Sequence, residues 1–174
     1  LGQAIRTYQS EVENGEVPDS YVFFYGRENF PEYYNESISY QFGKAQVLEQ
    51  GDAACVVATG PTVAKALLAQ KALAKEGINI TVVNNPFVNK PDLEVIGSAL
   101  KGAGNKLVTV EDHQIKGGMG SLLVHALKMA GHNCSVKSLG ILGEFGQSAY
   151  KADDLYAKNL MDDQAIIKAV KELL

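Results

Sequence analysis

The sequence contains only two cysteines among its 174 residues, Cys55 and Cys134. Two cysteines so far apart do not form the dense disulfide framework of small secreted domains, so we expect both to be free thiols. Each lies within an apolar run, which predicts burial, whereas a catalytic thiol needs an electropositive and partly exposed setting. We therefore expect neither cysteine to act as a nucleophile or a redox centre.

Long apolar runs and an excess of basic charge are also absent. No stretch approaches the roughly 18 apolar residues needed to cross a bilayer, and the N-terminus lacks the basic and apolar parts of a signal peptide. The net charge is −4 and the pI is about 5.4, which argues against a general nucleic-acid-binding protein. We expect a cytoplasmic protein whose partners include neither a membrane nor a nucleic acid.

The chain begins at Leu1 rather than at Met, and Leu1 leads directly into a predicted helix over residues 2–13. A continuous aromatic and β-branched run at residues 21–25 then predicts a buried strand. We interpret this beginning as a piece of something longer. Residues 28–41 are polar, aromatic and irregular, and they are the best candidate for a linker.

After residue 41, predicted strands alternate with predicted helices. Several strands are uniformly apolar rather than alternating, which is typical of strands covered on both faces. We therefore expect a three-layer α/β/α sandwich with a mostly parallel (mixed) sheet of about five strands. The predicted strands cover residues 44–50, 53–59, 78–84, 106–110 and 134–140, and the predicted helices cover 61–76, 92–102, 118–131 and a C-terminal helix capped by Asp162 or Asp163.

The turn Thr59-Gly60-Pro61-Thr62 is the first candidate anion site. It joins a predicted strand to a helix, and a helix N-terminus offers free amides and the positive end of the helix dipole. A dinucleotide-binding fingerprint needs three glycines in G-x-G-x-x-G, and this turn has one. The alternative, which the sequence favours, is a tight connection between strand and helix.

The second candidate places Glu111, Asp112 and His113 at the end of a predicted strand, directly before the glycine-rich segment 117–121. Ligands of open α/β sheets bind at the carboxyl ends of strands, and glycines can cradle a phosphate. The segment lacks the Lys-Ser/Thr of a nucleotide P-loop, and three adjacent side chains cannot converge on one metal ion. Close approach of a helix to the sheet is the alternative, and we expect no metal site.

Arg27 is the third candidate, because it follows the predicted strand 21–25 directly after Gly26. A planar guanidinium with five donors suits a bidentate grip on phosphate or carboxylate, although an exposed arginine is often only a solvated charge. The sequence has no G-x-S-x-G elbow and no zinc-ligand spacing. The residues alone predict an α/β domain with candidate anion-binding turns.

Four segments, taken in order, resemble the C-terminal end of transketolase: FFYGRENFP at 23–31, VVATGPTVAKALLAQKALAKEGINITVVN at 56–84, LVTVEDHQIKGGMGS at 107–121, and residues 143–174 with FGQSA near their start. This C-terminal domain is shared by thiamine-diphosphate enzymes that include deoxyxylulose-phosphate synthase and the β subunits of 2-oxoacid dehydrogenases. Glu-Asp-His before the glycines favours transketolase within that group.

The resemblance implies a thiamine-diphosphate-dependent enzyme that transfers a two-carbon ketol unit between sugar phosphates and uses a divalent metal, Mg or Ca. It divides the chain into a remnant of the pyrimidine-binding domain at 1–30, a linker at 31–42 and the C-terminal domain at 43–174. Arg27 matches the arginine that holds the sugar phosphate, although Gly26 and Glu28 differ from the residues that the family often has beside it. The family's catalytic, cofactor-binding and metal-binding residues have no counterpart in this chain.

The resemblance therefore implies an assembly role, in which the chain completes a homodimer together with the missing N-terminal regions of the same enzyme and is inactive alone. Two alternatives stay open. The chain could be a free-standing interaction or regulatory domain, or the C-terminal part of a deoxyxylulose-phosphate synthase or a 2-oxoacid dehydrogenase β subunit. A partial pyrimidine-binding domain would leave Ile5, Tyr8 and residues 21–25 without their neighbours, so we expect self-association through residues 1–30 or a loss of order there.

Overall fold

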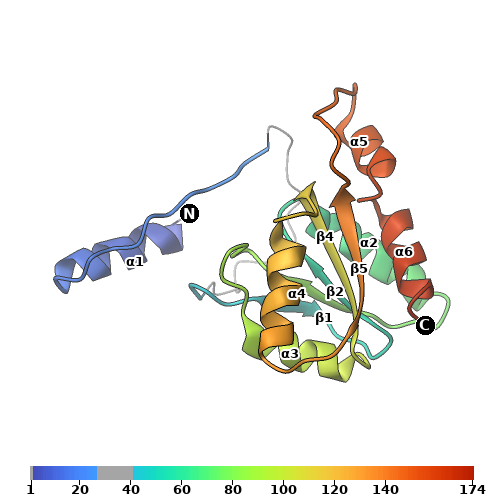
Figure 1. Ribbon diagram of the computed structural model, residues 1–174, viewed down its shortest axis with the longest axis horizontal. Coiled ribbons are helices and arrows are strands. Elements are labelled where there is room, and N and C mark those ends of the chain that lie inside the picture. The colour runs from blue at the N-terminus through green and yellow to red at the C-terminus, as the bar shows by residue number, and fades with distance from the viewer. Residues whose placement is uncertain (1, 27–40) are drawn as a thin grey trace.

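The computed structural model has a five-stranded sheet with helices on both faces (Figure 1). The structure describes residues 2–26 and 41–174. The strand order is β1-β3-β2-β4-β5, in which β1 is antiparallel to β3 and the other pairs are parallel. The predicted mixed, mostly parallel sheet is confirmed. Its strands are β1 (Gln46–Glu49), β2 (Cys55–Ala58), β3 (Thr81–Asn84), β4 (Lys106–Gln114) and β5 (Ser135–Ile141).

Four helices form the outer layers of the sandwich. The first layer consists of α2 (Thr62–Ala74) and α6 (Asp163–Lys171), and the second consists of α3 (Leu93–Gly102) and α4 (Met119–Met129). Neighbouring residues of a strand point to opposite faces, so Val56 of β2 joins the core beneath α2 and α6 while Val57 joins the core beneath α3 and α4. Because both faces are covered, every residue of β2 is buried, as the apolar runs predict.

The C-terminal helix α6 follows its sequence signals closely. The side chain of Asp162 caps it by accepting a hydrogen bond from the backbone N–H of Ala165 at 2.9 Å. Ile166 and Val170 are fully buried against the sheet, as the helical spacing predicts. Leu174, which follows the end of α6, is exposed.

The N-terminal helix α1 (Gly2–Glu13) has the predicted bounds and lies apart from the sheet (Figure 1). The apolar residues Ile5, Tyr8 and Val12 are 50%, 46% and 50% exposed. This face of α1 is therefore uncovered in the described part of the chain. None of the helices within residues 2–26 and 41–174 combines the length and the apolar character that a membrane crossing requires.

The prediction of a buried strand at residues 21–25 is wrong for this chain. These residues form no strand, and Val22 and Phe24 are 74% and 87% exposed. A strand requires a neighbour to pair with its backbone N–H and C=O groups, and none of the five described strands pairs with this segment. Tyr21 instead packs edge-on against Phe42, with ring centroids 5.1 Å apart.

Two further features differ from the sequence expectations. Strand β4 continues past Val110 to Gln114, so Glu111, Asp112 and His113 lie within the strand rather than after it. The extension is paired with β5, since Gln114 lies opposite Ile141 in the register. In addition, a short helix, α5 (Ala152–Lys158), precedes α6.

Candidate functional site

The two candidate turns of the described chain lie at one edge of the sheet, where the parallel strands β2 and β4 end. These strands are neighbours, and the helices that follow them, α2 and α4, lie on opposite faces of the sheet. Such a divergence is the position at which open α/β sheets bind ligands. The hydrogen bonds within each turn decide whether an anion finds free donors there.

The turn between β2 and α2 is closed by its own hydrogen bonds. The hydroxyl oxygen of the buried Thr62 lies 2.8 Å from the carbonyl oxygen of Thr59 and 2.9 Å from that of Val110 in β4. The N–H of Val63 donates to the carbonyl of Gly60 at 3.2 Å, and Gly60 has a φ of +58°, which glycine adopts without strain. These contacts support the interpretation of this turn as a tight connection between strand and helix, and they also join α2 to β4.

The turn between β4 and α4 is filled by the carboxylate of Glu111, which is 2% exposed. Its Oε2 accepts a hydrogen bond from the N–H of Met119 at 2.5 Å, and its Oε1 accepts one from the N–H of Gly120 at 2.8 Å. These amides belong to the first turn of α4, where the helix dipole favours negative charge. The chain's own carboxylate therefore occupies the position that a bound phosphate would take.

The glycines of this turn provide the space for that carboxylate. A Cβ atom on Gly118 would lie 2.2 Å from Oε2 of Glu111, and one on Gly120 would lie 2.4 Å from Oγ1 of Thr109. Close approach of α4 to the sheet, which the sequence offered as the alternative, is thus the interpretation that the geometry supports. Sequence reasoning missed Glu111 as a cap because it precedes Met119 by eight residues, beyond the reach of local capping motifs.

Asp112 and His113 make separate local contacts. Oδ2 of Asp112 accepts a hydrogen bond from the Tyr156 hydroxyl at 3.2 Å, and Nδ1 of His113 lies 3.1 Å from the carbonyl oxygen of Gln114. Across residues 2–26 and 41–174, no three His, Cys, Asp or Glu side chains come together in a way that could hold a metal ion. The acidic and histidine residues that the sequence placed together thus have different partners.

The two free cysteines occupy different environments. Cys55 is fully buried in β2, and burial raises the pKa of its thiol to about 12. Cys134 is only partly buried, so the prediction of burial is correct for Cys55 and too strong for Cys134. Burial also raises the pKa of Cys134, although the positive charge of Lys128 opposes this shift. A raised pKa lowers the thiolate fraction at neutral pH, which agrees with the expectation that neither thiol is an activated nucleophile.

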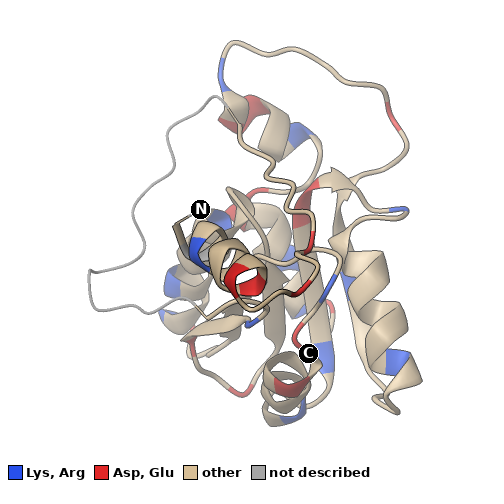
Figure 2. Cartoon of the chain, turned by 90° about the vertical axis from the view of Figure 1, so that its left-hand side faces the viewer, with Lys and Arg blue, Asp and Glu red and all other residues tan. Residues whose placement is uncertain are grey.

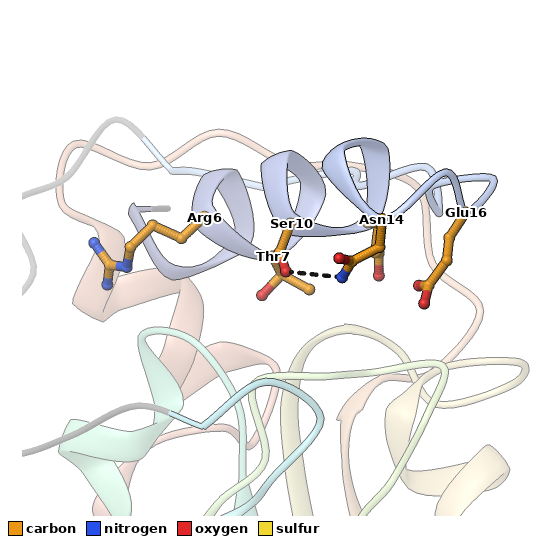
Figure 3. Close-up of a pocket in the computed structure, with 6 residues that line it drawn as sticks. Arg6, Thr7, Ser10, Asn14 and Glu16 are labelled. Carbon is orange, nitrogen blue, oxygen red and sulfur yellow. Dashed lines mark hydrogen bonds between the residues drawn. The ribbon is translucent and has the colours of Figure 1, made fainter.

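Outside the sheet, a pocket runs along α1 (Figure 3). Its lining comes from this helix and the turn after it, so it is an open surface with no opposing layer of described side chains. Figure 2 shows acidic and basic residues interspersed along the chain, with neither sign gathered in one region. The residues that line the pocket are Arg6, Thr7, Ser10, Glu11, Asn14 and Glu16.

Arg27, the predicted contact for the substrate phosphate, lies outside the described residues, as do its neighbours up to residue 40. The structure therefore does not test this assignment. The structure describes two of the three candidate anion sites. In both, the polar groups form hydrogen bonds with other groups of the chain itself.

The fold and these turns define a class of protein: a three-layer α/β domain with a mixed five-stranded sheet, whose ligand edge is closed by its own side chains. The sequence profile of the family described as "Transketolase, C-terminal domain" matches residues 43–166. The chain belongs to this family, and the resemblance stated from the sequence is confirmed.

Individual relatives agree with this assignment. The chain is 35% identical over 143 residues to a protein named 1-deoxy-D-xylulose-5-phosphate synthase from Syntrophus aciditrophicus (strain SB), a match that covers 80% of this chain and 21% of the relative. It is 33% identical over 137 residues to a "Putative transketolase C-terminal section" from Methanocaldococcus jannaschii, a match that covers 79% of this chain and 42% of the relative. The chain thus spans less than half the length of these relatives.

A solved structure is also similar. The protein described as "Split gene transketolase, inactive beta4 tetramer" superposes with a TM-score of 0.79 and 31% sequence identity. The match covers 86% of this chain and 48% of that structure's chain. The three-layer fold with its mixed sheet is therefore the fold of a transketolase C-terminal domain.

Proposed function

We propose that this chain is the C-terminal portion of a thiamine-diphosphate-dependent transketolase, which transfers a two-carbon ketol unit between sugar phosphates. In this proposal the chain contributes to assembly and is not catalytic alone. The observation that supports it most directly is the carboxylate of Glu111 at the N-terminus of α4, because the family-typical Glu-Asp-His and glycine segment builds the fold there instead of a ligand site. The family match at residues 43–166 supplies the enzyme context.

The proposed division of the chain follows from the same resemblance. Residues 1–30 would be the remnant of a pyrimidine-binding domain, residues 31–42 a linker, and residues 43–174 the C-terminal domain. The uncovered apolar side chains of Ile5, Val22 and Phe24 support a missing neighbour for the first of these parts.

The described residues do not fit the family's cofactor. Thiamine diphosphate and its Mg or Ca ion need diphosphate donors and several oxygen ligands around the metal. The amides at the N-terminus of α4 are taken by Glu111, and the described residues contain no group of three acidic, His or Cys side chains for a metal. In the proposed enzyme the cofactor is held by the missing N-terminal regions, and the chain alone binds none.

Arg27 is the residue of this chain that we propose to contact the substrate, through the phosphate of the sugar. The test uses the complete enzyme with Arg27→Gln and with Arg27→Lys as the conservative variant. Loss of a charge-assisted contact should raise the KM of a phosphorylated donor about 10- to 100-fold, with a smaller rise for Lys. The KM of an unphosphorylated ketol donor should stay the same, and an equal rise for both donors would refute the phosphate contact.

A second candidate function is deoxyxylulose-phosphate synthesis, which the relative from Syntrophus aciditrophicus favours through its name and its 35% identity. A 2-oxoacid dehydrogenase β subunit and a free-standing regulatory domain are further alternatives. The complete enzyme should turn over xylulose 5-phosphate with ribose 5-phosphate if it is a transketolase. Turnover that requires pyruvate would favour the other enzymes instead. A natural gene product that begins near Leu1 and purifies without a cofactor-binding partner would favour the free-standing domain.

The proposal also includes a cytoplasmic homodimer that acts in sugar-phosphate metabolism of the pentose phosphate type. The expectation of self-association through residues 1–30, or of a loss of order there, stays a prediction. Light scattering of the purified chain tests it, and a strictly monomeric species with a well-ordered N-terminus would contradict it.

A further inference from the structure

Residues 142–160, here called the flap, connect β5 to α6 and include α5. In Figure 1 they lie beyond the end of the sheet toward which β4 and β5 point, above α6. No residue of α5 is buried, and Leu142, Phe145 and Tyr150 are 66%, 94% and 99% exposed. The flap therefore contributes little to the hydrophobic core, in contrast to α6 directly after it.

Polar contacts hold the flap against the body of the domain. Nζ of Lys65 in α2 lies 2.7 Å from Oδ1 of Asp153 and 5.7 Å from the centre of the Tyr156 ring. The Tyr156 hydroxyl donates to Asp112 in β4 at 3.2 Å, and its ring packs against the core beneath α2 and α6. We call Lys65, Asp112, Asp153 and Tyr156 the latch. The latch thus joins the flap to α2, the helix after β2, and to the end of β4.

Both ends of the flap have a left-handed backbone. Gly143 has a φ of +80° and Leu160 a φ of +56°. Leucine disfavours this conformation, and such outliers often occur at pivots. Gln114 fixes the first end, since its Oε1 accepts from the N–H of Gly143 at 2.8 Å and its Nε2 donates to the carbonyl of Glu144 at 2.9 Å. Met161, which is 1% exposed, fixes the second end in the core.

We propose that residues 142–160 open as a unit about Gly143 and Leu160, and that the latch keeps them docked against α2 and the end of β4. This inference is independent of the enzyme in which the domain works. The physical basis is a difference in local stability: the flap is held by a few polar contacts and by the partly buried ring of Tyr156, whereas β4 and α6 are held by several buried apolar side chains. Opening would free the carboxylate of Asp112, which is already exposed, from its hydrogen bond with the Tyr156 hydroxyl.

Amide hydrogen exchange of the whole chain tests the proposal. The N–H of Met161 reports on the flap, because it donates to the carbonyl of Tyr156 at 2.8 Å, across the pivot at Leu160. In the unmodified chain this amide should exchange through an opening that is insensitive to low denaturant, while the amides of β4 should exchange only through global unfolding.

Variants of the latch then test how it acts. Lys65→Met, Asp153→Asn and Tyr156→Phe should each speed exchange at the Met161 amide about two- to five-fold, since partly exposed ion pairs and single hydroxyl contacts are weak. Exchange in α6 should not change. High salt should speed flap exchange in the unmodified chain and have a smaller effect in the Lys65→Met variant.

Lys137→Met is the matched control, because it breaks an ion pair of similar length, 2.6 Å, between Lys137 and Glu172 that joins β5 to α6. It should leave exchange in the flap unchanged. A Met161 amide that exchanges only with global unfolding would overturn the proposal of a separate opening. Latch variants that do not speed flap exchange, or that speed it equally throughout the chain, would overturn the role of the latch.

Discussion

Glu111→Gln is the substitution that should most clearly separate the proposed structural role of this turn from a ligand-binding role. Glutamine keeps the shape of the side chain but removes its charge, and it turns one of the two acceptor oxygens into a donor. That donor would then face an amide N–H, either of Met119 or of Gly120, whose present acceptor lies at 2.5 or 2.8 Å. One charge-assisted hydrogen bond is lost, and a buried N–H is left without an acceptor.

The magnitude follows from these contacts. A hydrogen bond to a charged group contributes about 1.5–3 kcal/mol, and a carboxylate at a partly buried helix N-terminus contributes up to about 2 kcal/mol more. Because Glu111 is 2% exposed, solvent screening does not reduce these values much, and we expect the free energy of unfolding to fall by about 2–4 kcal/mol. For a chain of this size that corresponds to a Tm lower by about 5–15 °C.

Urea unfolding at neutral pH, followed by circular dichroism, measures the effect, with a constant m-value as the check on two-state behaviour. Glu94→Gln is the matched control, because Glu94 is an 84% exposed carboxylate that pairs with Lys44 at 3.0 Å. Its effect should stay within about 0.5 kcal/mol. A Glu111→Gln variant as stable as the Glu94→Gln variant would refute the assignment of Glu111 as the cap of α4.

Three other substitutions or conditions test separate parts of the structure. In the folded chain at pH 8, a thiol reagent should modify Cys134 and leave Cys55 unmodified, because burial raises the pKa of Cys55 to about 12, and intact mass counts the labels. The hydrogen bond from Lys137 lowers the pKa of Glu172 below its ordinary value of 4.5. The ion pair therefore stabilises the fold at any pH above 4.5. This stabilisation is lost as the pH falls through the lower pKa that Glu172 has in the folded chain. A double-mutant cycle of Lys137→Met and Glu172→Gln should therefore show coupling at pH 6 that disappears near pH ~2. Gly120→Ala should lower the free energy of unfolding by about 1–3 kcal/mol, because the added methyl group has no space beside the sheet.

Each of these three predictions has a control measurement or a result that would contradict it. In urea both thiols should react, and modification of both in the folded chain would contradict the burial of Cys55. Coupling between Lys137 and Glu172 that is equal at both pH values would contradict an ionic origin. Gly146→Ala, at a position with open space around its Cβ, should leave stability within about 0.5 kcal/mol of the original, and an equal effect of Gly120→Ala would contradict the close packing.

The alternation of strands and helices could be predicted from the sequence because local signals mark it. Uniformly apolar runs indicated strands with both faces covered, and Asp162 indicated the start of α6, which it caps. The fold class follows from that order, since a parallel sheet needs helices as its connections.

The remaining features depend on contacts between distant residues. Residues 21–25 have the composition of a strand, but composition does not reveal that no described strand pairs with them. Glu111 belonged to a candidate ligand site in the sequence, and only the packing of α4 onto β4 turns its carboxylate into a helix cap. Helix α5 was missed because its 7 residues are too few to show a clear helical period in the sequence.

We proposed above that this domain contributes to the assembly of a thiamine-diphosphate enzyme and does not catalyse the reaction itself. The direct measurement compares ketol transfer from xylulose 5-phosphate to ribose 5-phosphate, with thiamine diphosphate and Mg²⁺, by the purified chain alone and by the chain joined to the cofactor-binding regions of its own enzyme. We expect no turnover and no cofactor binding by the chain alone, and turnover by the complete assembly. Measurable turnover by the 174-residue chain, or a complete assembly that is inactive with these sugars and with pyruvate as donor, would contradict the account.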